Sequence, residues 1–142
     1  DKFSENISRL VSGMGLSERV LLPGMRGYID DQDACAMRKE CDAYVFPSLK
    51  EGFSLTPMEA QYFGKPCVIS NIPIHNEVYG DSVLYFDPSS VNDIAEKINA
   101  LLTDEGLRQD LINRGYKNII KYSWDKTADV TLRVFNEILQ NS

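Results

Sequence analysis

The feature that most constrains the fold of this 142-residue chain is an alternation of short apolar runs with longer amphipathic runs. The apolar runs are rich in β-branched and aromatic side chains and predict strands. Between them, apolar residues recur at the spacing of a helix. Strands that alternate with helices are typical of a parallel sheet in an α/β fold. The expected strands cover residues 20–22, 43–46, 66–69 and 83–86.

Helices are expected around these strands, and several carry clear end signals. Gly15 ends the first helix, Asp30 is an N-cap for the second, and Gly64 stops the third. By contrast, Pro73 and the single histidine, His75, fall in a predicted loop, so His75 is interpreted as a surface residue. The expected helices cover residues 3–14, 31–40, 57–63, 91–102, 107–122 and a last segment capped by Ser123.

Two carboxylates, Glu51 and Glu59, stand eight positions apart where a predicted strand gives way to a helix. Thr56 suits an N-cap, Pro57 the first helical position and Glu59 the third, so these residues predict a capping box. The amides of residues 54–58, Pro57 excepted, then lie at a helix N-terminus. Such amides bind phosphate, because the helix dipole favours negative charge there.

This segment has a structural and a functional interpretation. In the first, Glu59 is only a cap, Glu51 is a solvated loop charge, and Phe53 and Leu55 are apolar anchors. In the second, each carboxylate accepts hydrogen bonds from a vicinal diol, at about 1.5–3 kcal/mol per charge-assisted bond. A diphosphate over the amides, with one carboxylate on a ribose and the other on a sugar, then predicts a nucleotide-sugar site.

The same segment resembles a known family. Its acids match the Glu-x7-Glu motif in the C-terminal domain of the retaining glycosyltransferases of family 4 (group 1), which have the GT-B fold. The resemblance covers essentially the whole chain. The matching stretches are Arg19-Val20-Leu21-Leu22-Pro23-Gly24, residues 28–42, Val45-Phe46-Pro47-Ser48-Leu49, Glu51-Gly52-Phe53-Ser54-Leu55, Glu59-Ala60, Gly64-Lys65-Pro66-Cys67-Val68-Ile69, Asp87-Pro88 and Tyr122-Ser123-Trp124.

The resemblance implies roles for single residues. Glu59 is expected to contact the ribose hydroxyls, and Glu51, the expected catalytic residue, contacts the donor sugar or lies close to it. Many members have a second glycine where this chain has Ser54, whose side chain is expected to narrow the space for the sugar. The expected donor-binding residues are Glu51, Gly52, Phe53, Ser54, Leu55 and Glu59.

Composition excludes other classes of function. The formal net charge of −6 argues against a nucleic-acid-binding module and provides no polybasic membrane anchor. No apolar run is long enough to span a bilayer, and no signal peptide is recognised. The length suits one domain, and the content of 43% hydrophobic and 25% charged residues suits a globular protein. The expected localisation is cytoplasmic, or peripheral at the inner face of a membrane.

Neither a metal nor a cofactor is predicted. Cys35, Cys41 and Cys67 lack a zinc-type spacing, so they are expected to be reduced, intracellular and mostly buried. Asp31-Gln32-Asp33 resembles the DxD metal motif of the other large glycosyltransferase fold, but acids at a helix start are explained by the helix dipole. The nucleotide sugar is therefore expected as a substrate without a resident cofactor.

The resemblance also implies that parts of the family's fold lie outside this sequence. The family's C-terminal domain begins with two more strand–helix units, whose Arg and Lys neutralise the donor diphosphate, and no residue before Arg19 fits them. The N-terminal acceptor domain is absent as well. Without the first strand, the edge of the 43–46 strand is exposed. The chain is therefore expected to be the ordered remnant of a longer protein, to pair with a second chain or copy, or to move the 20–22 strand beside it.

The predicted fold is an α/β, Rossmann-like parallel sheet with flanking helices, the C-terminal half of a GT-B fold lacking its first strand–helix units. The functional hypothesis is the donor-binding domain of a retaining glycosyltransferase, inactive alone, that uses a UDP- or GDP-linked sugar and a glycan, lipid-linked or small acceptor. The alternative is a non-catalytic nucleotide-sugar-binding or regulatory subunit that works with a separate partner chain.

A second rival is a receiver-like signalling domain, which has the same alternation of strands and helices. Such a domain needs a phosphorylatable Asp at the end of a strand, and this chain has Pro47-Ser48 there, so this class is disfavoured.

Overall fold

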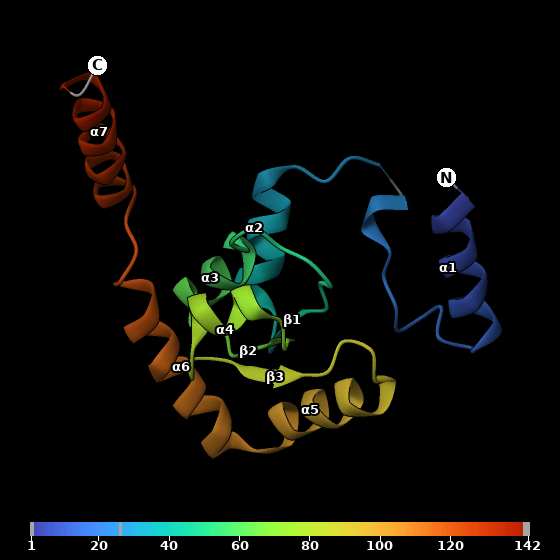
Figure 1. Cartoon of the computed structure of the whole chain (residues 1–142). Helices are drawn as coiled ribbons and strands as arrows, with labels where there is room; N and C mark the ends of the chain where they lie inside the picture. Colours follow the sequence, from blue (N-terminus) through green and yellow to red (C-terminus); the bar gives the residue numbers. More distant parts are fainter. Residues whose placement is uncertain (1, 26, 141–142) are drawn as a thin grey trace. The chain divides into compact units, whose positions relative to one another are not determined.

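The computed structural model describes residues 2–25 and 27–140, which divide into two compact units, Asp1–Met37 and Arg38–Ser142. Each unit is described by itself. The first contains α1 (Lys2–Gly13), the 3-10 helix η1 (Pro23–Met25) and the start of α2 (Asp31–Glu40). The second contains the end of α2 and then β1 (Tyr44–Phe46), α3 (Leu55–Tyr62), β2 (Cys67–Ser70), α4 (Pro73–Tyr79), β3 (Leu84–Phe86), α5 (Val91–Thr103), α6 (Glu105–Ile119) and α7 (Trp124–Gln140) (Figure 1).

Both helices of the first unit were predicted from their end signals. After α1, Gly15 adopts a φ of 68°, which is the left-handed conformation that ends many helices. At the start of α2, the carboxylate of Asp30 accepts a hydrogen bond from the amide of Asp33 at 2.8 Å, as an N-cap does. These two helix ends depend on neighbouring residues alone, which explains why the sequence predicts them.

The predicted strand at residues 20–22 is wrong. The segment has no strand structure, Leu21 is 69% exposed, and Pro23 begins η1 directly afterwards. A strand is stabilised by hydrogen bonds from its amides and carbonyls to a neighbouring strand. A three-residue apolar run that is followed by proline does not stay extended as a strand without such a neighbour. The expectation that this strand would move beside the 43–46 strand is therefore wrong as well.

The other three predicted strands are confirmed. They form a parallel sheet in the order β1-β2-β3, with Val45 opposite Val68 and Ile69 opposite Tyr85. All four residues of the central strand β2 are buried. A parallel strand that is covered on both faces has a nearly continuous apolar sequence, as Cys67, Val68 and Ile69 of β2 do.

Helices cover both faces of the sheet in the second unit (Figure 1). On one face, Cys67 and Ile69 of β2 pack with Ala60 of α3 and with residues of α4. On the other face, Val68 packs with Leu101 of α5 and Leu111 of α6. The strand therefore sends alternate side chains into two hydrophobic clusters, and the second unit is a three-layer α/β/α arrangement.

Helix α4 replaces the loop that was predicted around His75. Pro73 occupies the start of this helix, where its fixed φ fits and its missing amide hydrogen is not needed. The sequence interpretation treated proline as a loop signal, although it is equally common at a first helical position. As a result His75 lies inside a helix and is fully buried, so its prediction as a surface residue is wrong.

The three C-terminal helices begin at side-chain caps, of which only Ser123 was predicted; α6 starts at Glu105, two residues before its predicted start. Ser90, Asp104 and Ser123 each accept a hydrogen bond from the amide three residues further on, at 3.2, 2.9 and 3.1 Å. All three cysteines are free, but only Cys67 is buried, while Cys35 and Cys41 are half-buried, so the expectation of mostly buried cysteines is wrong. Within residues 2–25 and 27–140, no helix has the length and apolar character needed to cross a membrane.

Candidate functional site

The loop between β1 and α3 carries the residues on which the functional hypothesis depends. Helix α3 begins at Leu55, two residues earlier than predicted, and Ser54 occupies its N-cap position with φ 72° and ψ 76°. Ser54 is the one non-glycine residue with positive φ in the described part of the chain. A left-handed conformation costs a residue with a side chain about 1–2 kcal/mol, so the surroundings of Ser54 must stabilise it.

The predicted capping box at Thr56 and Glu59 is wrong. Because α3 starts at Leu55, these residues occupy its second and fifth positions, and Pro57 its third. The Thr56 hydroxyl is buried and makes no hydrogen bond, so it does not cap the helix. Proline remains acceptable at the third position, since the first four amides of a helix have no intrahelical acceptor. Local pattern alone does not distinguish these two starts.

Ser54 is held from both its side chain and its backbone. Its hydroxyl lies 3.0 Å from Nε2 of His75, and its carbonyl accepts a hydrogen bond from the hydroxyl of Tyr79. Both partners belong to α4. Each such bond contributes about 0.5–1.5 kcal/mol, so the pair is of the size needed to offset the strain. Burial raises the pKa of Tyr79, which keeps its hydroxyl protonated as a donor.

The hydrogen bonds of His75 fix its tautomer. Nδ1 lies 2.7 Å from the carbonyl oxygen of Ser70, which can only accept, so Nδ1 carries a proton. In the neutral ring Nε2 is then an acceptor, and the Ser54 hydroxyl donates to it. The Ser54 side chain consequently points into the core and is 8% exposed as a residue. The Ser54 hydroxyl thus faces His75, and the effect of this side chain on the space for a sugar stays a prediction.

The amides of the loop are free to bind an anion. Among the residues that the structure describes, the amides of Gly52, Phe53 and Ser54 donate no hydrogen bond. The amide of Leu55, the first residue of α3, has no intrahelical acceptor. Successive amides without an acceptor beside a helix N-terminus are the kind of donors that suit phosphate.

The outer side of the loop is anchored by aromatic packing. The ring of Phe53 meets the ring of Tyr122 edge to face, with centroids 5.5 Å apart. The hydroxyl of Tyr122 in turn donates to the carbonyl of Val78 in α4 at 3.0 Å. Phe53 remains 37% exposed, so it is an anchor with one accessible side. The loop is thus held to α4 directly at Ser54 and, through Tyr122, at Phe53.

The two predicted carboxylates lie at opposite ends of this amide row in the sequence, and their surroundings differ. Glu51 is half-buried, and its Oε1 accepts a hydrogen bond from the hydroxyl of Ser48 at 2.6 Å. Glu59 is 47% exposed, and its Oε2 lies 3.1 Å from Nε of Arg38. The Nε–H of Arg38 is not aligned for a hydrogen bond, so this contact is an ion pair by proximity. Each carboxylate keeps oxygen lone pairs for a ligand.

A shallow pocket of about 240 Å³ surrounds Glu59 within the second unit. Its volume is somewhat below the roughly 300–1,000 Å³ of typical small-molecule sites. Tyr62 and Trp124 on its walls are 68% and 76% exposed. The pocket is lined by Leu55, Met58, Glu59, Tyr62, Ile119 and Trp124.

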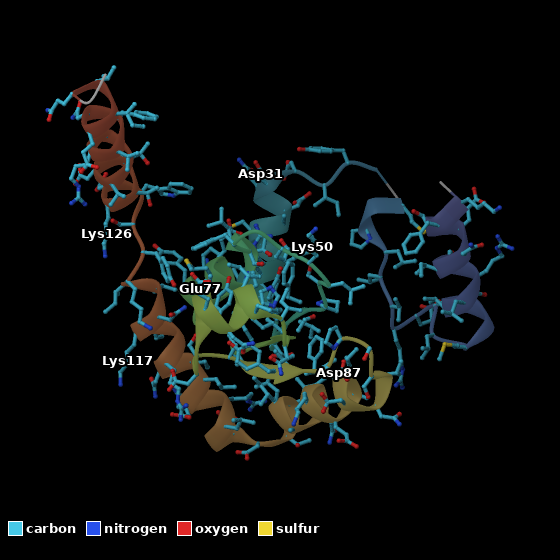
Figure 2. All side chains as sticks on the ribbon, in the orientation of Figure 1. Asp31, Lys50, Glu77, Asp87, Lys117 and Lys126 are labelled. Carbon is cyan, nitrogen blue, oxygen red and sulfur yellow. The ribbon has the colours of Figure 1, made fainter. Side chains whose placement is uncertain are left out.

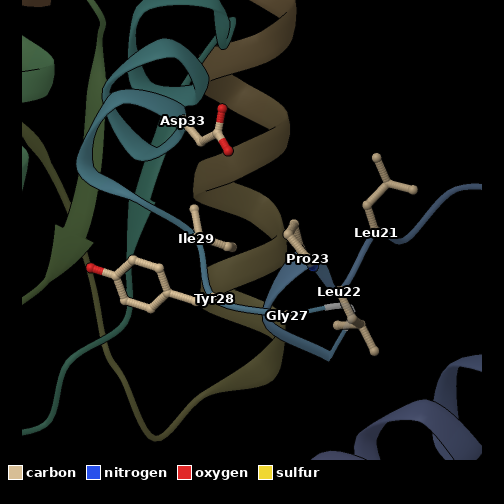
Figure 3. A pocket seen from close by; sticks show the side chains of 7 residues that line it. All are labelled: Leu21, Leu22, Pro23, Gly27, Tyr28, Ile29 and Asp33. Carbon is tan, nitrogen blue, oxygen red and sulfur yellow. The ribbon is translucent and has the colours of Figure 1, made fainter.

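A second pocket, of about 250 Å³, lies within the first unit (Figure 3). Its lining comes from the segment that precedes α2, and Tyr28 there is 90% exposed. Asp33 also reaches it, while Asp31 and the rest of that acidic stretch start a helix. In the part of the chain covered by the structure, no group of three His, Cys, Asp or Glu residues could hold a metal ion.

The fold therefore defines the class of protein as a Rossmann-like α/β protein, with a loop of free amides at the carboxyl end of a parallel strand. By sequence, the profile of the family described as "Glycosyl transferases group 1" matches residues 2–118. The chain belongs to this family.

A relative by sequence agrees with that assignment, and two solved structures share the fold. The chain is 37% identical over 138 residues to the serotype-specific mannosyltransferase WbdA of Escherichia coli, covering 97% of this chain and 17% of that protein. It superposes on sucrose-phosphate synthase from Thermosynechococcus elongatus with a TM-score of 0.82 at 23% identity, covering 97% of this chain and 35% of the other. The C-terminal domain of the glycosyl transferase group 1 protein LpcC from Francisella tularensis gives 0.72 at 24% identity, covering 84% and 62%. The chain thus spans about a sixth of the length of its WbdA relative, and the predicted α/β fold is confirmed.

Proposed function

We propose that this chain is the donor-binding part of a retaining, family 4 glycosyltransferase with the GT-B fold. The observation that carries the proposal is the row of free amides at residues 52–55, turned by the left-handed Ser54 and flanked by Glu51 and Glu59. Membership of the group 1 family supports transfer of a glycosyl group as the reaction. The donor in this proposal is a nucleoside diphosphate sugar.

The amides of Gly52, Phe53, Ser54 and Leu55 hold the diphosphate or sugar oxygens in this proposal. When the bond to the donor sugar breaks, negative charge develops on the departing diphosphate. Amides that are already oriented stabilise this charge without reorganising, and the dipole of α3 adds to their effect. Catalysis is then mainly positioning and electrostatic stabilisation, with no covalent intermediate on the protein.

Glu51 and Glu59 orient the two sugars of the donor. Glu51 contacts or approaches the transferred sugar, and the hydroxyl of Ser48 keeps its carboxylate on the loop. Glu59 accepts hydrogen bonds from the ribose hydroxyls, and the exposed half of its carboxylate is available to them. The neighbouring guanidinium of Arg38, 3.1 Å away, restrains the Glu59 side chain for this role.

The donor sugar and the acceptor are proposed from the relatives of this chain. The relative WbdA is a mannosyltransferase, which makes mannose the first sugar to test. The acceptor we propose is a glycan or a lipid-linked glycan of polysaccharide biosynthesis. The chain alone is inactive in this proposal, because acceptor binding requires the N-terminal domain, and neither a metal nor a cofactor takes part.

Calorimetric titration of the 142-residue chain with UDP, GDP and ADP tests the donor site. We expect one nucleotide to bind, and Glu59→Gln to weaken it about tenfold, the loss of about one charge-assisted bond. Arg38→Gln is the matched control, because it removes the same ion pair and leaves the carboxylate. Glu77→Gln controls for net charge, since Glu77 is an exposed acid on α4 (Figure 2).

The controls separate a ribose contact from a structural effect. If Arg38→Gln weakens binding as much as Glu59→Gln, the ion pair and not the ribose contact accounts for the loss. Binding that is unchanged in both Glu51→Gln and Glu59→Gln would contradict the proposed donor site. Retention is tested in the longer enzyme by proton NMR, which reports whether the product keeps the anomeric configuration of the donor.

A further inference from the structure

We infer that His75 is the positioning residue of the 52–55 loop: it holds Ser54 in the left-handed conformation and so sets the direction of the loop amides. The importance of these amides for a donor rests on the proposed function. The contact between His75 and the loop is independent of that function. His75 does not reach a ligand itself, since it is fully buried.

The loop needs such a residue because Ser54 does not favour its own backbone conformation. A glycine would adopt a φ near 72° without help, but a serine has a Cβ that disfavours it. The two flanking amides change direction with the backbone angles of residue 54. If Ser54 relaxed to an ordinary conformation, the amides of residues 54 and 55 would change their orientation relative to each other.

His75 is well placed to hold Ser54, because it is itself fixed on every side. Its Nδ1 donates to the carbonyl of Ser70 at the end of β2. Its backbone carbonyl accepts from the hydroxyl of Tyr85 in β3 at 3.0 Å. The ring lies against Phe46 of β1, with centroids 5.7 Å apart. The Ser54 hydroxyl is therefore bonded to a group that is anchored to all three strands of the sheet.

A buried Ser–His pair also occurs where a serine acts as a nucleophile, but the burial here argues against that role. Ser54 is 8% exposed and its hydroxyl faces the buried ring, so an external substrate has no access to the oxygen. A nucleophile must lie at an accessible surface beside its base. The pair therefore orients the backbone and does not attack a substrate.

Substitutions at residue 54 give a direct test by NMR of the ligand-free chain. In wild type we expect the strong intraresidue NOE between the amide and α protons that marks a left-handed residue. Ser54→Ala removes the bond to His75 but keeps the Cβ, so this NOE should weaken. Ser54→Gly removes the bond and the Cβ together, so the conformation should persist. His75→Phe should weaken the NOE in the serine background. In the glycine background the strong NOE should stay on the same, stereospecifically assigned α proton, because glycine has two.

Nucleotide affinity is the second measurement on the double-mutant cycle of His75→Phe and Ser54→Gly. With GDP or UDP as the probe, His75→Phe should reduce affinity roughly tenfold in the wild-type background and much less in the Ser54→Gly background, as expected for coupled residues in contact. Val78→Ala is the control, since Val78 is a buried residue of the same helix. It should lower the melting temperature without changing the NOE at residue 54.

The outcomes for His75 and for the proposed function are separable. If the left-handed NOE persists in both Ser54→Ala and His75→Phe, the inference about His75 is overturned, whether or not a nucleotide binds. If the NOE depends on His75 but none of the nucleotides binds wild type, His75 still positions the loop and the proposed donor site fails. A loss of the NOE in Val78→Ala would also overturn the inference, since general destabilisation would then suffice.

Discussion

The two units of the chain differ in how their side chains are buried. Every buried side chain in the described part of the chain belongs to Arg38–Ser142, and none belongs to Asp1–Met37. Leu10 in α1 and Met14 directly after it are 59% and 63% exposed, whereas Leu101 in α5 is completely buried. A sheet that brings distant segments together creates a core, and a unit of helices and turns without strands has not done so here.

This difference places the candidate site on the well-packed unit. The loop at residues 52–55 and both carboxylates lie in Arg38–Ser142, and their contacts run to α4, α2 and the segment after α6 within that unit. A site needs supporting residues that are themselves fixed. The comparison therefore predicts that substitutions of the same kind will have large effects in the second unit and small effects in the first.

The largest expected difference in the free energy of unfolding is between alanine substitutions of two leucines. Leu101→Ala should lower the free energy of unfolding by about 2–5 kcal/mol, because it leaves a cavity where Val68, Phe86 and Leu111 now pack. Leu10→Ala, at an exposed position of α1, should change it by less than about 0.5 kcal/mol. Urea unfolding followed by circular dichroism measures both. Equal losses would show that α1 packs in solution as firmly as the sheet.

Two glycines with the same backbone conformation sharpen the comparison. Gly15 in the first unit has φ 68° and Gly64 in the second has φ 69°. Gly15→Ala should cost only the strain, about 1–2 kcal/mol, because nothing lies near the added Cβ. Gly64→Ala should cost about 1 kcal/mol or more beyond that, since its Cβ would run into the hydroxyl of Tyr116, which must move.

The control for this pair is Tyr116→Ala, which removes the obstructing side chain. In that background, the loss of unfolding free energy caused by Gly64→Ala should fall to that of Gly15→Ala. Thermal melting of the four variants measures the differences. A persistent excess at Gly64 would mean that contacts other than the tyrosine account for it.

A buried polar network offers a third, smaller contrast. The amide group of Gln61 donates to the carbonyl and hydroxyl oxygens of Ser82 and accepts from Asn118 at 3.1 Å. Gln61→Ala should lower the free energy of unfolding by about 1–3 kcal/mol, because it leaves these buried groups unpaired. Gln32→Ala, at an exposed position of α2, is the matched change in the first unit and should be nearly neutral. A neutral Gln61→Ala would show that water replaces the lost partner.

The sequence predicted the elements whose signals are local. The helix that starts after Asp30 and the one that starts after Ser123 have their caps within three residues, and both appear as expected. The apolar sequence of β2 predicts a buried strand without any knowledge of how that strand pairs with its neighbours. The 20–22 run had a similar apolar composition, but pairing depends on a neighbouring strand, which local composition does not reveal.

The residues of the candidate site come from the sequence motif and stay a prediction, whereas the contacts that hold them come from the structure. The acids and the loop amides could be identified from the motif alone. The left-handed Ser54 depends on His75 and Tyr79, which are 21 and 25 positions away, so no local pattern contains it. The one signal available was Pro73 two residues before the histidine, which is compatible with a helix start. Reading Pro73 as N1 would have placed His75 in a helix, although not in contact with Ser54.

The smallest expected effect is a dependence of stability on alkaline pH, carried by Tyr85 in the second unit. Burial, with a smaller contribution from the Asp81 carboxylate, raises the pKa of Tyr85 to about 12 from its ordinary value of 10.0. Because the folded pKa is the higher one, the stabilisation by the neutral hydroxyl is fully present below pH 10 and is lost as the pH rises through about 12. Tyr85→Phe has no ionisable hydroxyl at this position and loses the hydrogen bond to the His75 carbonyl. It should therefore be less stable than wild type by about 0.5–1.5 kcal/mol at pH 8, and this gap should shrink above pH 10.

Urea unfolding of the two proteins at pH 8, 10 and 11 measures this gap. Tyr28→Phe, at a 90% exposed position of the first unit, is the control and should follow wild type throughout. A gap between wild type and Tyr85→Phe that stays constant with pH would mean that the Tyr85 hydroxyl is not desolvated in the folded state. Water would then reach the packing around His75 more easily than the rest of the sheet. The carboxyl ends of the strands, where the loop is held, would in that case be less well buried than the rest of the second unit.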